Sequence, residues 1–249
     1  MSLVAERCRI VLVRPAIAAN IGAVARAMHN FGLTQLVLVT PVASPLDENA
    51  RQLATHGEHL LNQARVVDSL DSAVADCVFV AGTSARTEGL IRGCDVSTPR
   101  IFMPTLLASL QAGPVALVFG PETTGLTNQE VTRCDQLLTI PASEVYPVLN
   151  LAQSVVICLY ELFQAAQEQS LEPVSTDLAD HATQQQMFHH LEQALRDIHF
   201  LWDERAPVQM NALRHLLSRS RLTAMEVGLL HGIARQLQWH VRTYGPRVE

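Results

Sequence analysis

The sequence contains no apolar run of the ~18–20 residues that a membrane-spanning helix requires. Its first segment, from Met1 to Arg14, is too short and too charged to be a secretory signal. We therefore expect a cytoplasmic protein with no membrane partner.

Cysteine is also sparse. The five cysteines are odd in number and scattered, and no two form a Cys-x-x-Cys pair. This spacing argues against a zinc site and against a disulfide framework. We expect the cysteines to be small buried residues instead. They are Cys8, Cys77, Cys94, Cys134 and Cys158.

Positive charge is in deficit, since the formal net charge is −6. This balance argues against bulk, non-specific binding of nucleic acid, but it leaves room for a local basic site. The segment from Arg205 to Arg221 contains no acidic residue. Its basic residues form a cluster, and a cluster of basic residues is more often a solvated face than a binding site.

Six short apolar segments have the character of buried parallel strands. Helical patterns separate them, and this alternation predicts an α/β domain: an open parallel sheet with helices on both faces. Such sheets bind ligands at the carboxyl ends of their strands. The expected strands are 9–13, 36–39, 66–67, 77–81, 115–119 and 137–140, and the expected helices are 21–31, 69–75, 104–110 and 151–167.

The composition changes after residue 167. Residues 168–181 are polar, contain Pro173 and are typical of a linker. Three helices are expected beyond it, at 182–201, 207–219 and 223–243. Pro207 suits the start of the second helix, and Thr223 with Glu226 predicts a capping box for the third. The predicted organisation is an α/β domain at 1–167, a linker at 168–181 and a small helical extension at 182–249.

The loop after the first expected strand contains Asn20, Gly22 and Arg26 in the pattern N-x-G-x-x-x-R. Asn20 is a good N-cap for the following helix, and Gly22 permits close approach to its first turn. Arg26 lies more than one turn further along. Taken alone, the pattern is more often a capped helix with one exposed arginine.

The loop after strand 115–119 places Glu122 between Gly120 and Gly125. Glycines at the end of a strand allow a ligand to reach backbone groups. A buried Glu122 would need polar partners, and Thr127 with Glu130 predicts a cap for the next helix. Taken alone, this segment is an ordinary strand-to-helix turn.

Two further loops follow expected strands. Pro141 and Pro147 stiffen the loop after 137–140 and exclude a helix before Asn150, which would cap the next helix. The segment Gly82-Thr83-Ser84-Ala85-Arg86 offers backbone groups and hydroxyls to a polar ligand and a basic residue to a phosphate.

In this order, the loops resemble the signature motifs of the SPOUT-class RNA 2′-O-methyltransferases of the TrmH-like superfamily. These motifs are N-x-G-x-x-x-R, F-G-x-E-x-x-G-L, and I-P followed by L-N-L-A. The resemblance covers about residues 8 to 165 and is closest to the TrmJ-type tRNA (cytidine/uridine-32-2′-O)-methyltransferases. The Gly-Thr-Ser-Ala-Arg segment and the helical extension are also similar to that subgroup.

The resemblance implies a trefoil knot at the C-terminal end of the α/β domain and a homodimer with each site completed across the interface. It implies S-adenosylmethionine as methyl donor, tRNA as substrate, and no metal. The implied cofactor-binding residues are Thr83, Ser84, Ala85, Gly120, Ile140, Pro147, Val148 and Leu149. The implied RNA-binding residues are Arg14, Arg86, Arg214, Arg219 and Arg221.

The resemblance also implies a catalytic set consisting of Arg26, Asn20, Glu122 and Asn150. Arg26 matches the family's catalytic arginine. A guanidinium stays protonated at neutral pH, so we expect Arg26 to anchor a phosphate and stabilise the forming alkoxide rather than act as a general base. Asn20 and Glu122 would shape the same site, and Asn150 would order the third motif.

The sequence departs from the subgroup at two positions. Val148 stands where serine commonly precedes Leu-Asn, and Pro121 stands where arginine commonly follows Phe-Gly. Both departures leave the exact nucleotide and the base preference open. Methylation of another tRNA position or of ribosomal RNA is an alternative, as is a catalytically degenerate RNA-binding protein of the same fold.

Two other readings bear on function. A dehydrogenase is disfavoured because no G-x-G-x-x-G follows the first strand. In the helical extension, the apolar stripe is most simply explained by core packing. The alternative is that the extension docks tRNA through Arg214, Arg219 and Arg221.

Overall fold

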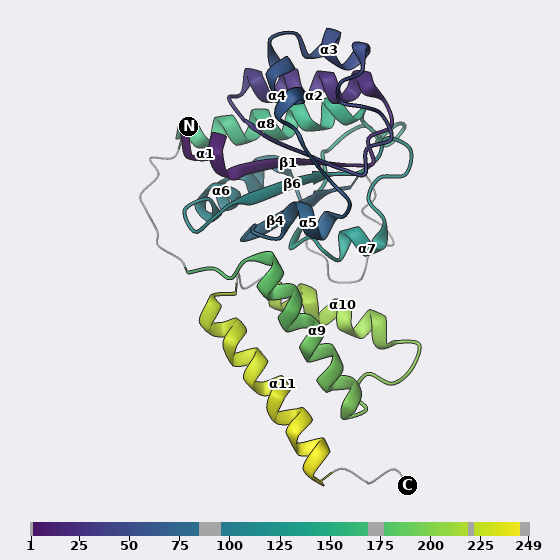
Figure 1. Ribbon diagram of the computed structural model, residues 1–249, viewed down its shortest axis with the longest axis vertical. Helices are drawn as coiled ribbons and strands as arrows, with labels where there is room; N and C mark the ends of the chain where they lie inside the picture. Colours follow the sequence, from purple (N-terminus) through teal and green to yellow (C-terminus); the bar gives the residue numbers. More distant parts are fainter. Residues whose placement is uncertain (1, 85–95, 169–176, 219–221, 245–249) are drawn as a thin grey trace.

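The computed structural model describes residues 2–84, 96–168, 177–218 and 222–244 (Figure 1). In these ranges, seven strands form one parallel sheet in the order β3-β2-β1-β6-β4-β7-β5. The strands are β1 (Cys8–Val13), β2 (Gln35–Val39), β3 (Arg65–Val67), β4 (Phe79–Thr83), β5 (Val96–Ser97), β6 (Val115–Phe119) and β7 (Gln136–Leu138).

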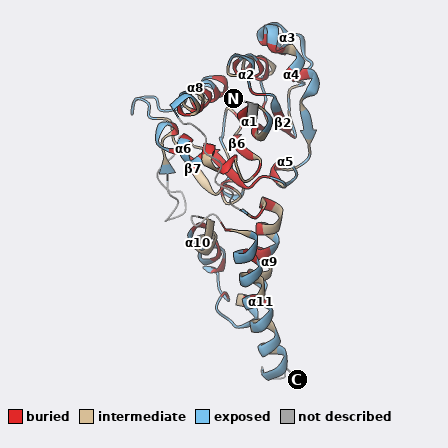
Figure 2. Ribbon diagram, turned by 90° about the vertical axis from the view of Figure 1, so that its left-hand side faces the viewer, coloured by how far each residue is buried: buried red, intermediate tan, exposed pale blue. Residues whose placement is uncertain are grey.

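Helices cover both faces of the sheet, as the sequence predicts. Along β1, Ile10 and Leu12 face one hydrophobic core, whereas Val11 and Val13 face the other. Buried residues gather in the sheet and on the helix faces that pack against it (Figure 2). The helices around the sheet are α1 (Ser2–Arg7), α2 (Ala18–Asn30), α3 (Glu48–Ala54), η1 (Thr55–Gly57), α4 (Glu58–Gln63), α5 (Leu70–Val74), α6 (Pro99–Ser109), α7 (Asn128–Val131) and α8 (Leu151–Glu168).

Two predicted strands are misplaced. The strand expected at 77–81 is β4, which begins at Phe79, because Cys77 still belongs to a turn in which its N–H donates to Val74 O. The strand expected at 137–140 ends at Leu138. Gly82 and Thr83 are therefore the end of a strand rather than part of a loop.

Two predicted helices begin earlier than expected. The helix expected at 104–110 is α6, which begins at Pro99, where proline suits the first turn of a helix. The helix expected from residue 21 is α2, which begins at Ala18.

The extension contains α9 (His181–Asp197), α10 (Ala206–Ser218) and α11 (Ala224–Tyr244) around a separate hydrophobic cluster. The predicted end of the first helix at residue 201 is wrong, because His199 adopts a positive φ of 59°. The predicted capping box of α11 is confirmed by the bonds Thr223 N→Glu226 Oε2 (2.8 Å) and Glu226 N→Thr223 Oγ1 (3.3 Å). The division at 1–167, 168–181 and 182–249 stays a prediction, and residues 169–176 of the linker lie outside the described ranges.

The extension sits beside α5 and α7 (Figure 1). The backbone N–H groups of His181 and Ala182 donate to Cys77 O and Ala75 O, at 2.6 and 2.9 Å. Arg133, which follows α7, donates across to Gln185 Oε1 of α9 at 3.0 Å, and an ion pair with Asp71 at 3.0 Å anchors it within the α/β part. Of the helices described, none is long and apolar enough to cross a membrane.

Candidate active site

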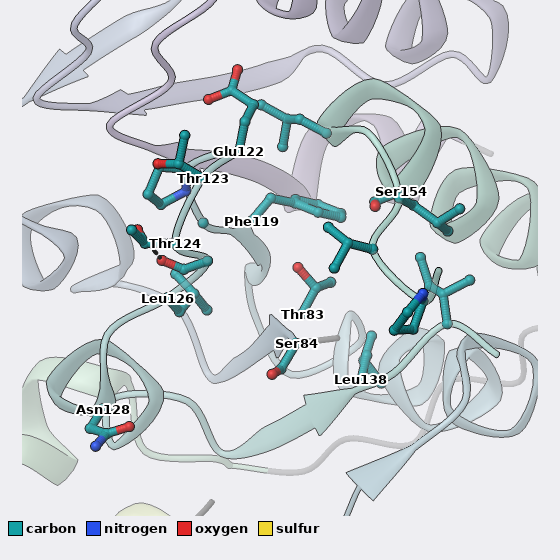
Figure 3. Close-up of a pocket in the computed structure, with 18 residues that line it drawn as sticks. Thr83, Ser84, Phe119, Glu122, Thr123, Thr124, Leu126, Asn128, Leu138 and Ser154 are labelled. Carbon is teal, nitrogen blue, oxygen red and sulfur yellow. Dashed lines mark hydrogen bonds between the residues drawn. The ribbon is translucent and has the colours of Figure 1, made fainter. Parts of the chain in front are cut away.

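The carboxyl ends of β1, β4, β6 and β7 lie together, because β6 pairs with β1 on one side and with β4 on the other, and β4 pairs with β7. The loops that follow these strands enclose a pocket, which α8 completes (Figure 3). The pocket is lined by Thr83, Ser84, Phe119, Gly120, Pro121, Glu122, Thr123, Thr124, Gly125, Leu126, Asn128, Leu138, Ile140, Pro147, Val148, Leu149, Leu151 and Ser154.

The structure brings most of the predicted cofactor residues to this one pocket. Ala85 is the exception, because it lies outside the described residues. The predicted cofactor residues that line the pocket are Thr83, Ser84, Gly120, Ile140, Pro147, Val148 and Leu149.

The chemistry of the lining suits a ligand with a flat apolar part and several polar groups. Leu126, Ile140 and Val148 supply apolar surface, and the hydroxyls of the Thr and Ser residues supply polar contacts. Within the described part of the chain, the backbone N–H groups of Ile140, Val148 and Leu149 make no hydrogen bond. Backbone groups at a pocket wall that lack internal partners are available to a ligand.

Gly120 makes the turn between β6 and the pocket loop possible. A Cβ atom at this position would lie 2.3 Å from the backbone nitrogen of Leu126 and 2.4 Å from the carbonyl carbon of Gly125. Neither backbone atom can move away cheaply, so only glycine fits where the loop folds back on itself. Gly125, at the other side of this contact, has a φ of +66°.

Beside the pocket, three predicted residues form a continuous hydrogen-bonded chain. Asn20 Nδ2 donates to Glu122 Oε1 at 2.7 Å, and Asn150 Nδ2 donates to Asn20 Oδ1 at 3.0 Å. The second oxygen of Glu122 accepts from Ala16 N at 3.1 Å. This series of hydrogen bonds joins all three signature motifs. The Glu122 carboxylate accepts from two neutral donors rather than from a cation.

Asn150 caps α8 as predicted, because its Oδ1 accepts from Ala152 N at 2.9 Å. The predicted capping role of Asn20 is wrong. Helix α2 begins at Ala18, with Ile17 at the N-cap position, so Asn20 lies inside the first turn. Its side chain is buried and is used by Glu122 and Asn150 instead of the helix backbone.

Arg26 lies further along α2 and is exposed. It does not line the pocket of its own chain. Within the described residues, no hydrogen bond or ion pair holds its guanidinium. The group is therefore free to meet a ligand or a second chain.

The predicted RNA-binding arginines have different surroundings. Arg14 pairs with Glu130 through both nitrogens of its guanidinium. Arg214 donates to Gln185 Oε1 at 2.7 Å and stacks over the ring of Phe188 at 4.8 Å. RNA binding by either one stays a prediction, and both are already engaged within the chain. Arg86, Arg219 and Arg221 lie outside the described residues.

Several residues of the site were not among those predicted from the sequence. Thr123, Thr124 and Ser154 line the pocket, and Glu130 anchors its loop. The sequence could have indicated Ser154, because it lies four residues after the predicted cap Asn150. In the structure, its hydroxyl donates to Asn150 O at 3.1 Å. The sequence could not have indicated the pairing of Glu130 with Arg14, because 116 positions separate the two residues.

The described cysteines are free and buried, as predicted for Cys8, Cys77, Cys134 and Cys158, whereas Cys94 lies outside the described ranges. Burial raises the pKa of Cys158 to about 12, so this thiol is not a nucleophile at neutral pH. Across the same residues, no group of three or more His, Cys, Asp and Glu side chains has the arrangement of a metal site.

Comparison with known proteins finds a matching family for the α/β part and another for the helical extension. Residues 7–160 match the SpoU rRNA methylase family, and residues 183–246 match the C-terminal domain of the tRNA methyltransferase TrmJ. The tRNA (cytidine/uridine-2′-O-)-methyltransferase TrmJ of Photorhabdus laumondii is 37% identical over 239 residues, covering 94% of this chain and 97% of the relative.

Two further proteins are similar to this chain over more than nine-tenths of its length. The tRNA (cytidine/uridine/adenosine-2′-O-)-methyltransferase TrmJ of Pseudomonas aeruginosa is 38% identical over 245 residues, covering 94% of each chain. The crystal structure of TrmJ from Z. mobilis ZM4 superposes with a TM-score of 0.79 at 34% identity, covering 92% of this chain and 98% of that one.

Proposed function

Because the chain belongs to the SpoU rRNA methylase family, we propose that it transfers a methyl group from S-adenosylmethionine to a ribose 2′-hydroxyl of tRNA. One observation carries the proposal: the Asn20–Glu122–Asn150 chain lies beside a pocket lined by seven predicted cofactor residues. The curated relatives that share 37–38% of their residues with this chain are tRNA 2′-O-methyltransferases by name.

The pocket fits the proposed cofactor. Leu126, Ile140 and Val148 offer apolar surface for a purine, and Thr83 keeps acceptor capacity although its hydroxyl donates to Val118 O at 3.2 Å. Free backbone N–H groups at Ile140, Val148 and Leu149 suit the purine edge. When bound, S-adenosylmethionine supplies an electrophilic methyl group on a good leaving group. We place a trefoil knot where the 139–150 segment and α8 close this pocket.

The protein's task is then to position the attacking oxygen and to stabilise the charge that develops on it. Glu122, fixed by Asn20 and Ala16, shapes the wall of the site. Asn150 ties the third loop to the same group. Arg26 anchors a phosphate of the RNA and stabilises the alkoxide, while the proton passes to solvent or to that phosphate.

We propose that the enzyme is a homodimer and that Arg26 serves the pocket of a second copy. Arg26 is exposed and lies outside the pocket of its own chain. The neighbouring helices α6 and α8 also expose apolar side chains, at Ile101, Val156 and Tyr160. An uncovered apolar surface of this kind favours association.

The substrate nucleotide is proposed to be position 32 of the anticodon loop, in cytoplasmic tRNA. Pro121 and Val148, the two departures from the subgroup, both line the pocket, so they bear on this choice. Another tRNA position and ribosomal RNA are the alternatives within the same chemistry.

The test is methyl transfer from radiolabelled S-adenosylmethionine to unmodified tRNA transcripts, with wild type beside Arg26→Ala and the product mapped by nucleoside mass spectrometry. A 2′-O-methylated nucleotide made by the wild type alone establishes the reaction, and its place establishes the position. Cofactor binding without transfer to tRNA or ribosomal RNA would identify a degenerate RNA-binding protein.

A further inference from the structure

Arg14 occupies an unusual backbone position at the end of β1. Its φ is +47°, in the left-handed region that residues other than glycine seldom adopt. Its backbone N–H donates to Val39 O at 2.8 Å, which fixes the turn against β2. Conformations of this kind persist only where surrounding contacts impose them, and they gather at functional sites.

The side chain of Arg14 crosses to α7. Both terminal nitrogens meet the Glu130 carboxylate: Nη1 bonds Oε1, and Nη2 bonds Oε2 at 3.0 Å. A bidentate pair fixes orientation as well as distance, which a single contact does not. The Glu130 side chain is only 14% exposed, so solvent does not screen the pair as it would on the open surface.

Glu130 has a second task. Its Oε2 accepts from Thr127 N at 2.8 Å, and Thr127 Oγ1 accepts from Glu130 N at 3.3 Å, which completes a capping box. Burial opposes ionisation of Glu130, but Arg14 and Thr127 outweigh it and lower the pKa of the carboxyl. Glu130 therefore holds the far end of the 120–127 loop and the start of the 14–17 loop together.

The same two loops meet again at the active site. Two residues beyond Arg14, Ala16 N donates to Glu122 Oε2 at 3.1 Å. The 14–17 loop is thus tied to the 120–127 loop at both ends, by Arg14 with Glu130 and by Ala16 with Glu122. Between these ties, the 120–127 loop forms one wall of the pocket.

We propose that Arg14 and Glu130 act as one positioning pair, which sets the distance between these loops so that Glu122 reaches Asn20 and the pocket wall closes on the cofactor. This inference rests on the proposed methyl transfer. It also assigns Arg14 a role inside the enzyme rather than in contact with RNA.

The test compares Arg14→Gln, Glu130→Gln and the double variant with wild type. The single oxygen of glutamine at position 130 can still accept from Thr127 N and keep the capping box, whereas its NH₂ group would face the Arg14 guanidinium, so the change breaks the bidentate ion pair. Calorimetry with S-adenosylhomocysteine measures the cofactor site without turnover, and steady-state kinetics separate kcat from KM for tRNA. Arg196→Gln is the matched control, since it breaks an exposed pair with Glu192 within α9.

Each single variant should weaken cofactor binding and lower kcat by roughly 10–100-fold, because small misplacements of reacting groups cost about that much. The double variant should be no worse than either single, because the two residues act as a unit. KM for tRNA should stay unchanged, and Arg196→Gln should match wild type in cofactor binding.

Three results would overturn the proposal. A raised KM for tRNA in Arg14→Gln alone would show that Arg14 binds RNA. Additive losses in the double variant would show two independent residues. A lower Tm with unchanged cofactor binding and kcat would show a purely structural pair.

If Arg14→Gln does not fold, Arg14→Lys keeps the charge without the bidentate contact, and wild-type binding and kcat in that variant would contradict the proposal. Failure of methyl transfer in wild type would instead refute the proposed function.

Discussion

The side-chain amide of Asn150 donates a hydrogen bond to that of Asn20 across a sequence separation of 130 residues, at 3.0 Å. The contact joins the first turn of α2 to the residue that caps α8. Because Asn20 also donates to Glu122, three distant parts of the chain share one polar link.

This link can be tested apart from the helix cap. Asn150→Asp keeps the oxygen that accepts from Ala152 N, but it removes the donor to Asn20 and sets a negative charge against Asn20 Oδ1. We expect a loss of activity with little loss of stability. Asn150→Ala should lose the cap as well, at a cost of about 1 kcal/mol. Kinetics and urea denaturation measure the two effects. Equal activity in Asn150→Asp and wild type would show that the link to Asn20 is dispensable.

Glu122→Gln tests the carboxylate at the centre of the link. Both of its oxygens accept hydrogen bonds, from Ala16 N and Asn20 Nδ2, whereas a glutamine presents one NH₂ group to a donor. One bond is lost, and a donor is left facing another donor, which costs about 1–3 kcal/mol. We expect weaker binding of S-adenosylhomocysteine by calorimetry and slower methyl transfer. An unchanged affinity for S-adenosylhomocysteine would show that Glu122 does not position the pocket wall.

The resemblance of the loops to the family motifs predicted Asn20, Glu122 and Asn150 as site residues, and the alternation of apolar strands with helices predicted the parallel sheet. The sequence did not predict how these residues are used. Asn20 has the chemistry of an N-cap, but α2 starts at Ala18, and a distant carboxylate uses the side chain instead. The sequence indicates RNA binding for Arg14 and a capping box for Glu130, and no local pattern indicates that the two residues meet. Strand β5 has two residues, too few for any periodicity.

Gly120→Ala should remove the pocket rather than a single contact. The added methyl group would lie 2.3 Å from the backbone nitrogen of Leu126, so the 120–127 loop must move. We expect no measurable binding of S-adenosylhomocysteine by calorimetry. The matched control is Gly228→Ala in α11, where a Cβ atom meets nothing within 4 Å, and which should raise stability by about 0.5–1 kcal/mol. Normal cofactor binding in Gly120→Ala would mean that the loop adapts.

His181 predicts a dependence of stability on pH. It is the first residue of α9 and is buried, and neither ring nitrogen has a hydrogen-bond partner among the described residues. Burial lowers its pKa to about 4, from 6.5 in the unfolded chain. The unfolded state therefore binds a proton first, and stability should fall as the pH drops from about 6.5 toward 4, by roughly 3 kcal/mol in all.

The measurement is urea denaturation of wild type and His181→Leu between pH 4 and pH 7, with the exposed His56→Leu as control. Asp135, whose pKa burial raises to about 7, contributes the opposite slope in both proteins, so their difference isolates His181. Parallel pH profiles for wild type and His181→Leu would contradict the prediction, because the histidine would then be free to take up a proton in the fold.

Deletion of residues 170–249 tests whether the extension takes part in tRNA binding. The extension has its own hydrophobic cluster, and the two clusters around the sheet contain none of its buried residues, so the α/β part should keep its cofactor pocket. We expect weaker binding of tRNA in filter assays, with unchanged binding of S-adenosylhomocysteine. Arg214 alone is a poor probe, because its contacts with Gln185 and Phe188 make its loss structural as well. Wild-type affinity for tRNA in the truncated protein would leave the extension with a packing role only.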